Sequence, residues 1–165
     1  MVFLPTHITH ARPSQEETPM RHALALAALL LFSVPALADD AVVGYVKTVK
    51  GDAYVVTGGK PVKAAVGTPV QSGSVLKTGS GASLGVTFKD NTVMSFGPDT
   101  ELTVDDYVYA PNQGNLKLGA SLAKGTLAYL SGAIAKIKPD AVAVKTPTGT
   151  IGVRGTHFVV KVETD

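Results

Sequence analysis

The sequence predicts an all-β domain, either a single compact β-sandwich or a short irregular β-roll of many short strands. Two observations carry this prediction. All 17 glycines lie after residue 38, and they separate short runs in which every second residue is apolar. Alternation with a period of two is typical of strands with one buried face. Turn signals at intervals of about 8–12 residues are typical of all-β architectures.

The expected strands follow one another from Leu84 to the end of the chain. Asp90-Asn91 should form a tight turn, because both residue types tolerate positive φ, and Gly97-Pro98-Asp99 should end the next strand. The stretch Ser131–Lys138 (SGAIAKIK) is interpreted as a further strand. The alternating apolar residues are Leu84, Val86 and Phe88; Met94 and Phe96; Leu102 and Val104; Leu116 and Leu118; Leu127 and Tyr129; Val142 and Val144; Ile151 and Val153; and Phe158, Val160 and Val162.

The N-terminal region predicts export. Residues 20–38 join a short basic start to an apolar run and end in Ala36-Leu37-Ala38 before Asp39, the pattern of a cleaved signal peptide. The apolar run is shorter than the roughly 20 residues that a membrane-spanning helix needs, so an uncleaved anchor is the less favoured interpretation. Residues 1–19 fit neither a signal nor a fold and are interpreted as an over-extended N-terminus. The β domain is then 39–165, soluble and periplasmic.

Composition excludes several functional classes. The chain has no cysteine, which rules out disulfides, thiolate chemistry and a lipid-modified cysteine. Its net charge is +2, and the lysines are scattered singly, which is typical of a solvated surface and not of a nucleic-acid interface. We therefore expect no nucleic-acid partner and no membrane span after signal cleavage.

No catalytic constellation is visible. His157 is the one histidine after the signal segment, and we expect it to point to solvent beside Phe158. The acidic pair Asp105-Asp106 should point to opposite faces of a strand. The segment GTIGVRGT resembles a phosphate loop but lacks the Gly-Lys-Ser/Thr ending, and a strand follows it. The sequence therefore predicts a protein that is not an enzyme and that has no cofactor and no metal.

The same glycine-rich segment has a structural interpretation. Gly152 and Gly155 would allow tight backbone geometry, and Arg154 would act as a clamp that satisfies carbonyls or a carboxylate where strands cross. A separate possibility concerns the tyrosines, which could form a sugar-stacking platform on one sheet face. They are Tyr45, Tyr54, Tyr107, Tyr109 and Tyr129.

Several motifs, taken in order, resemble the FecR domain family, the periplasmic module of iron-siderophore signalling regulators. They are Gly44-Tyr45-Val46, Gly51–Val55, Val75–Gly79, the hairpin from Ala82 to Leu102, and the closing TPTGTIGVRGTHFVV from Thr146 to Val160. The resemblance singles out these residues as structural motif positions: Thr78, Gly79, Asp90, Pro98, Pro147, Gly152, Arg154, Gly155, Thr156 and Phe158.

The resemblance implies an all-β periplasmic module that binds a protein or a ligand, with no catalytic residue to transfer. In the regulators a cytoplasmic anti-sigma segment and a membrane helix precede this domain; here a signal peptide takes their place. The hypothesis is a non-enzymatic exported binding module in envelope signalling or organisation. Its partner would be a receptor or a membrane signalling protein. The alternative is a peptidoglycan- or polysaccharide-binding module, and the oligomeric state is left open.

Overall fold

The computed structural model describes residues 41–155 and 157–163. The predicted signal peptide, the extension before it and the cleavage residues Ala36, Ala38 and Asp39 lie outside this part of the chain, as does Thr156. The signal-peptide and cleavage assignments therefore stay predictions.

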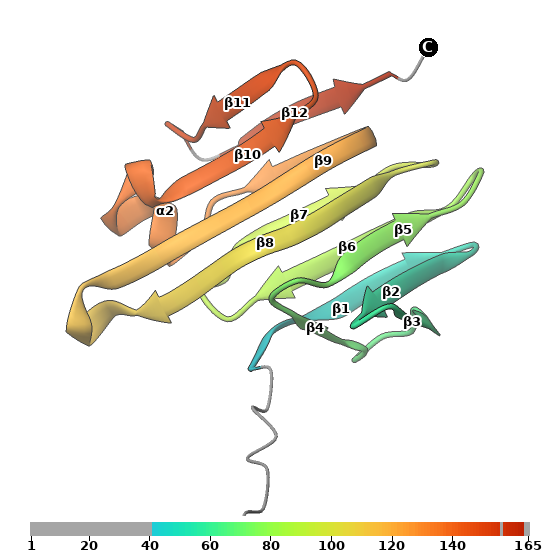
Figure 1. Ribbon diagram of the computed structural model, residues 1–165, viewed down its shortest axis with the longest axis horizontal. Helices are drawn as coiled ribbons and strands as arrows, with labels where there is room; N and C mark the ends of the chain where they lie inside the picture. The colour runs from blue at the N-terminus through green and yellow to red at the C-terminus, as the bar shows by residue number, and fades with distance from the viewer. Residues whose placement is uncertain (1–40, 156, 164–165) are drawn as a thin grey trace, which may run out of the picture. The chain divides into compact units, whose positions relative to one another are not determined.

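The described residues form two packed β layers (Figure 1). Neighbouring strands are antiparallel, with the exception of β10, which runs parallel to β9. The layer called sheet A contains, in spatial order, β4 (Pro69–Gln71), β1 (Val42–Lys50), β6 (Ser83–Phe88), β7 (Val93–Phe96), the second half of β9 (Asn115–Leu130) and β12 (His157–Val162). The layer called sheet B contains β3 (Lys60–Lys63), β2 (Ala53–Thr57), β5 (Val75–Thr78), β8 (Glu101–Ala110), the first half of β9, β10 (Val142–Thr146) and β11 (Gly149–Gly152).

The long strand β9 joins the two layers. Up to Lys124 it pairs with β8 and β10, and from Gly125 it pairs with β7 and β12. Gly125 has a φ of 90°, and a Cβ there would collide with Thr100. Glycine is therefore required where the strand passes from one layer to the other. The sequence predicted two separate strands in this region, whereas the structure has one strand of 16 residues.

The hydrophobic core fills the space between the layers. The residues that alternate in the sequence supply most of it, which confirms the all-β fold as a sandwich made from one curled sheet. Burial of one face of each strand is the main stabilising term in such a fold. The largest fully buried side chains are Tyr129, Leu76, Leu84, Met94, Leu102, Leu118, Leu122, Leu127, Ile134, Val46, Val70 and Val86.

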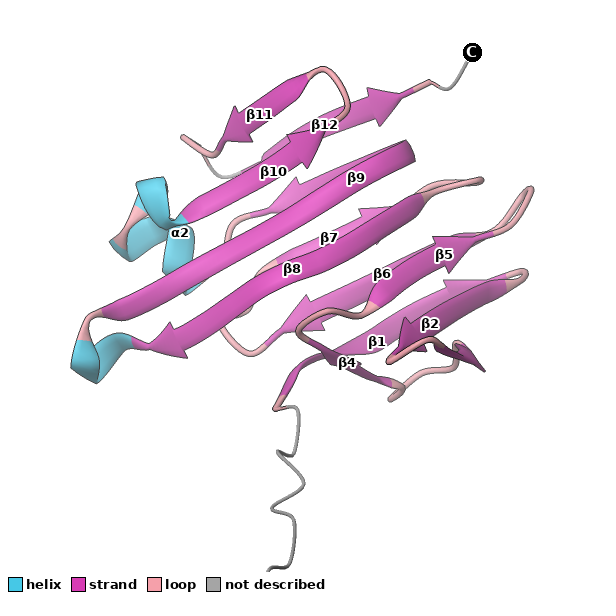
Figure 2. Ribbon diagram, viewed as in Figure 1, coloured by secondary structure: helices cyan, strands magenta, loops and turns pink. Residues whose placement is uncertain are grey.

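The prediction of a strand at Ser131–Lys138 is wrong. This stretch contains the short helix α2 (Ala133–Ile137), and the 3-10 turn η3 (Pro139–Ala141) follows it. A second 3-10 turn, η2 (Pro111–Gln113), connects β8 to β9. Because β10 is parallel to β9, the chain must cross back before β10 begins, and α2 lies in this connection (Figure 2). Topology therefore decides the conformation over the local alternation.

Candidate protein-interaction face

The outer face of sheet A carries two continuous rows of uncharged side chains. The pairing register places each row across five strands. The first row is Tyr45, Thr87, Val93, Leu130 and His157. The second row is Thr48, Gly85, Ser95, Ala128 and Val159. We call these ten residues the sheet A face.

The sheet A face exposes large apolar side chains. Tyr45 is 42% exposed, Leu130 is 47% exposed and Val159 is 61% exposed. The side chains of the second row project little from the sheet, because Gly85 has none and those of Ser95 and Ala128 are small. The two rows therefore present apolar and uncharged polar side chains, with the exposed Lys47 between them at the bulge of β1.

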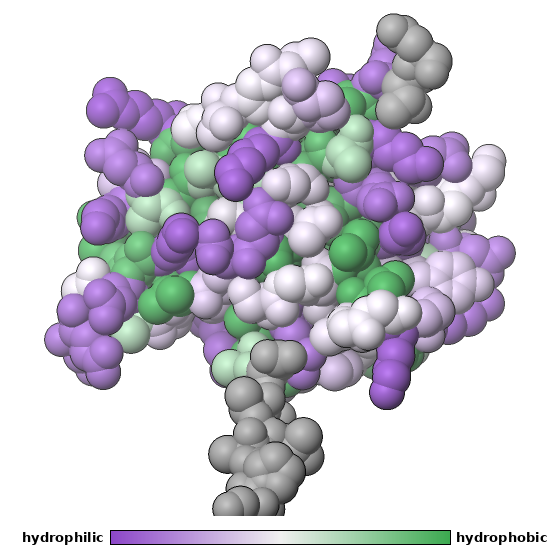
Figure 3. Space-filling view, viewed as in Figure 1, coloured by the Kyte–Doolittle hydropathy of each residue, from purple (hydrophilic) through white to green (hydrophobic). Residues whose placement is uncertain are grey.

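The outer face of sheet B has the opposite character. Hydrophilic side chains run across it in the view from the side of β8 and β9 (Figure 3). Lysines and acids pair across its strands and at its edge, and all of these pairs are at least partly exposed, so each contributes little stability. The pairs are Lys77–Glu101 at 3.3 Å, Lys117–Asp106 at 3.0 Å, Lys145–Asp105 at 3.8 Å and Lys63–Asp52 at 3.0 Å. The same face also exposes apolar side chains, among them Tyr54 and Val108.

The two adjacent acids on β8 do not point to opposite faces as predicted. A register shift in the pairing between β8 and β9 lies between Val104 and Asp106. Such a bulge places one extra residue on the outer side. Asp105 accepts a hydrogen bond from Ser121 at 2.6 Å, and Asp106 pairs with its own lysine. Each carboxylate therefore has a separate structural partner, and the pair is not arranged for acid–base chemistry.

Asp90 lies in a buried polar cluster behind the β6–β7 turn. The turn forms as predicted, with Asn91 at a φ of 64°. Asp90 is 1% exposed, and its carboxylate accepts hydrogen bonds from four donors. They are the Thr92 amide at 3.2 Å, the Thr92 hydroxyl at 2.7 Å, the Tyr107 hydroxyl at 3.0 Å and the Ile134 amide at 3.1 Å. A buried charge needs such a set of donors.

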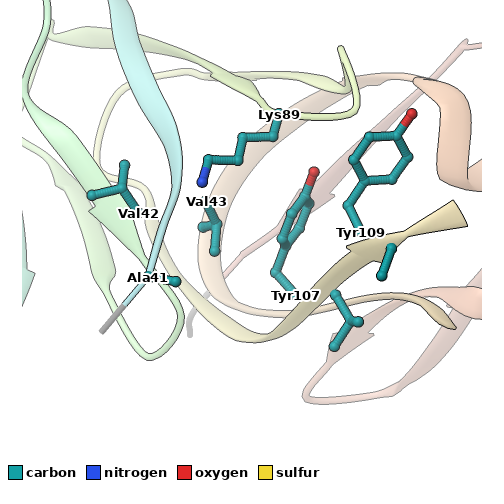
Figure 4. Close-up of a pocket in the computed structure, with 8 residues that line it drawn as sticks. Ala41, Val42, Val43, Lys89, Tyr107 and Tyr109 are labelled. Carbon is teal, nitrogen blue, oxygen red and sulfur yellow. The ribbon is translucent and has the colours of Figure 1, made fainter. Parts of the chain in front are cut away.

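Tyr107 is the part of this cluster that faces a pocket. Burial raises the pKa of Tyr107 well above its ordinary value, and the charge of Asp90 raises it further. Its ring stacks on Phe88 with the ring centres 5.5 Å apart. The pocket has a volume of about 260 Å³ and lies between the start of β1 and the end of β8, where Tyr107, Tyr109 and Lys89 line it (Figure 4). Because the Tyr107 hydroxyl is already bound to Asp90, it is a structural group and not a free ligand contact.

Thr78, Gly79 and Pro98 meet at the opposite end of the sandwich. The Thr78 hydroxyl donates to the Gly97 carbonyl at 2.6 Å and accepts from the Thr100 amide at 2.9 Å. The Gly79 carbonyl accepts from the Asp99 amide at 3.2 Å. The β5 end and the turn at Pro98 are thereby tied together. These motif residues stabilise turns and lie away from the sheet A face.

The closing motif is split between the two layers. Pro147 lies in the two-residue turn between β10 and β11, and Phe158 lies on β12, where its ring stacks on Tyr129 at 4.9 Å. Gly155 has a φ of 139°, and its carbonyl accepts a hydrogen bond from Ser131 at 2.6 Å. Gly155 thus has the special backbone geometry that the sequence suggested. Gly152 does not: it has no positive φ, and a Cβ there would meet nothing within 4 Å.

Arg154 lies at the crossing from β11 to β12. Its side chain is exposed and lines a hollow of about 300 Å³ together with Asp140 and Pro139. Among the described residues it forms no ion pair and no side-chain hydrogen bond. Its position at a strand crossing matches the sequence analysis, and its role as a clamp stays a prediction.

The tyrosines do not gather on one sheet face. Tyr45 lies on the sheet A face and Tyr54 on sheet B, Tyr107 and Tyr109 lie at the end of β8, and Tyr129 is in the core. The arrangement that the polysaccharide alternative required is therefore absent from the described residues. In the same part of the chain, no group of three or more His, Asp or Glu side chains could hold a metal ion. No described helix has the length and apolar character needed to cross a membrane.

Sequence reasoning missed the residues of the sheet A face. The signal was present in the outward positions of the alternating strands, where Leu130, Val159 and Ala128 stand in place of charged residues. The two outer faces therefore differ in charge: ion pairs cross sheet B, whereas the two rows of the sheet A face carry none. The chain belongs to the FecR protein family, whose model matches residues 74–165. Comparison with curated proteins and with solved structures finds no match.

Proposed function

We propose that this FecR-family protein is a non-enzymatic, exported binding module in cell-envelope signalling or organisation. Family membership supports the envelope-signalling context. The proposed mode of action is protein–protein contact in the periplasm, with a receptor or a membrane signalling protein as the partner. The predicted signal peptide at residues 20–38 supports export.

The observation that carries the proposal is the contrast between the two outer faces. Sheet B carries ion pairs beside exposed apolar side chains such as Val108, whereas the sheet A face exposes Tyr45, Leu130 and Val159 with no charge in either row. Exposed apolar area of this kind is costly in water unless a partner covers it. A protein surface with a matching apolar patch would gain the burial energy, and we place the docking site there.

The test is capture of periplasmic proteins with the native chain and with matched variants. Leu130→Lys adds a charge to the sheet A face, and Val108→Lys adds one at a similarly exposed apolar position on β8, where Leu130 is 47% and Val108 is 42% exposed. We expect the native chain and Val108→Lys to recover the same protein, and Leu130→Lys to lose it. Equal recovery by all three variants would place the docking site elsewhere. Co-sedimentation with purified peptidoglycan, with no protein recovered, would favour the polysaccharide alternative.

A further inference from the structure

The two layers end in four edge strands, and three of them are protected against pairing. β3 carries Pro61 between lysines, with all four residues exposed. β4 has three residues, begins with Pro69 and pairs through a register shift. β11 has four residues, of which the first and last are glycines. Proline, charge, irregular register and short length are the usual means of blocking an edge.

The fourth edge, β12, has no proline, no irregular register and no short length, and its one lysine, Lys161, lies near its end. It has six residues without proline or glycine, and its pairing with β9 is regular from His157 to Val162. Among the described strands, only β9 pairs with it. A long, regular and mainly uncharged edge is a template for another strand.

The residues whose backbone groups face outward on β12 follow from the pairing of β9. The Thr126 carbonyl accepts a hydrogen bond from the Gly97 amide at 3.0 Å, so the backbone N–H and C=O groups of Thr126 face β7. Backbone groups of successive strand residues point to alternate sides. The backbone groups of Leu127 and Tyr129 therefore face β12. They hydrogen-bond to the backbone of their register partners, Val160 and Phe158. The N–H and C=O groups of the intervening residues on β12, namely His157, Val159 and Lys161, face the free edge.

We propose that the free edge of β12 pairs with β12 of a second copy of this chain, antiparallel and centred on Val159. In that register Val159 lies opposite Val159 of the other copy, and His157 lies opposite Lys161. All outward groups are then used, in about six main-chain hydrogen bonds. Phe158 and Val160 lie opposite one another, so their partly buried side chains cover each other across the two-fold axis.

The second copy fits this edge because the strand is self-complementary. Its centre is the uncharged Val159, and the one charged residue of β12, Lys161, is paired with Glu163 of its own chain and lies opposite His157 of the other copy. Two-fold pairing closes the one unprotected edge and leaves none for further addition. It also continues the second row of the sheet A face through Val159 across the axis, while the first row meets Lys161 of the other copy opposite His157. This inference does not depend on the proposed partner protein.

The first test is mass in solution. Light scattering of the purified exported protein over about 1–500 µM should show a shift from one to two copies, as expected for a small strand-to-strand interface. Val159→Pro removes an outward N–H and should remain folded while it weakens the dimer about tenfold or more. Val160→Pro is the control for the assignment, because its N–H binds Leu127 and its loss should lower the melting temperature. A monomer at every concentration, or a Val159→Pro protein that melts as low as Val160→Pro, would overturn the proposal.

The second test reads the register by cross-linking, which is clean because the chain has no cysteine of its own. Opposed residues in hydrogen-bonded antiparallel pairs have Cα atoms about 5.5 Å apart, within disulfide reach. Under mild oxidation Val159→Cys should cross-link with itself. Lys161→Cys should not, but its equal mixture with His157→Cys should. Cross-linking of Val159→Cys no faster than Ser95→Cys, a sheet A residue away from the edge, contradicts the pairing. Self-linking of Lys161→Cys contradicts the register.

Discussion

At the scale of single residues, Asp90 and Tyr107 form a buried polar contact that links several elements of the fold. The Tyr107 hydroxyl donates to the Asp90 carboxylate at 3.0 Å and accepts from the Asp90 amide at 2.8 Å. The same carboxylate accepts a hydrogen bond from the Ile134 amide in α2, and the Asp90 carbonyl accepts one from the Ala133 amide. One side chain thereby ties the β6–β7 turn, β8 and the crossover to β10.

Tyr107→Phe should destabilise the protein, because it removes one donor from a buried carboxylate while the ring keeps its stack on Phe88. We expect a loss of about 1–3 kcal/mol in the free energy of unfolding. Urea unfolding followed by circular dichroism measures it. An unchanged midpoint would show that Asp90 is satisfied without Tyr107.

Tyr129→Phe is the matched comparison and should behave differently. The Tyr129 hydroxyl is buried and has no hydrogen-bond partner of good geometry among the described residues, although the Thr92 and Ser131 hydroxyls lie close enough to oppose the rise in its pKa. Removing an unsatisfied polar atom should leave stability within about 1 kcal/mol of the native chain or raise it slightly. A loss as large as that of Tyr107→Phe in the same urea experiment would reveal a partner for the hydroxyl.

The two buried tyrosines also predict the response to alkali. Burial raises the pKa of both Tyr107 and Tyr129 in the folded protein. Above pH about 10 the unfolded chain releases these protons before the folded chain does, so stability should fall as the pH rises, by at most about 1.4 kcal/mol per pH unit for each tyrosine. Phenolate absorbance should show two tyrosines that ionise only on unfolding. Ionisation of all five tyrosines before unfolding would contradict it.

At the scale of elements, the sequence predicts strands well and connections poorly. Alternation gives β6, β7, β8, β10 and β12 directly, since each buries one face. It divides β9 in two, because the local alternation does not show that one strand continues through Gly125, where the chain packs against Thr100. It makes α2 a strand, because the parallel pairing that demands a crossover is invisible in the local pattern.

Gly125→Ala should be strongly destabilising, because a Cβ at that bend meets the backbone and side chain of Thr100 at a φ of 90°. We expect a loss of about 2–4 kcal/mol, since neither strand can move without breaking its pairing. Gly152→Ala is the control: its φ is ordinary and the space around it is open, so it should change stability by less than about 1 kcal/mol. Thermal unfolding of the two proteins compares them directly. Equal melting temperatures would mean that β9 bends without needing glycine.

At the scale of the whole molecule, the candidate site depends on register more than on motif. The family motif residues that can be read from the sequence, such as Thr78, Asp90 and Gly155, are structural and lie in separate places. The sheet A face uses residues from five strands, and the separate sequence motifs that contain several of them do not show that they lie side by side. Their common lack of charge is visible in the sequence only when the strand order is known.

The last prediction concerns the part of the fold that the family segment leaves out. The family model begins at residue 74, yet β1 to β4 precede it and supply both sheets. β1 pairs with β6 and β2 pairs with β5, and Val46, Ala53 and Val70 are fully buried.

A chain of residues 74–165 should therefore fail to form a cooperative monomer. It would expose the edges of β6 and β5 and the apolar faces that β1 and β2 cover. A chain of residues 41–165 is the control and should melt in a single transition. Circular dichroism melting and binding of a hydrophobic dye measure the difference, with high dye binding and a broad melt expected for the shorter chain. A sharp melt of a monomeric 74–165 chain would show instead that the family segment is a domain by itself and that β1–β4 are an addition to it.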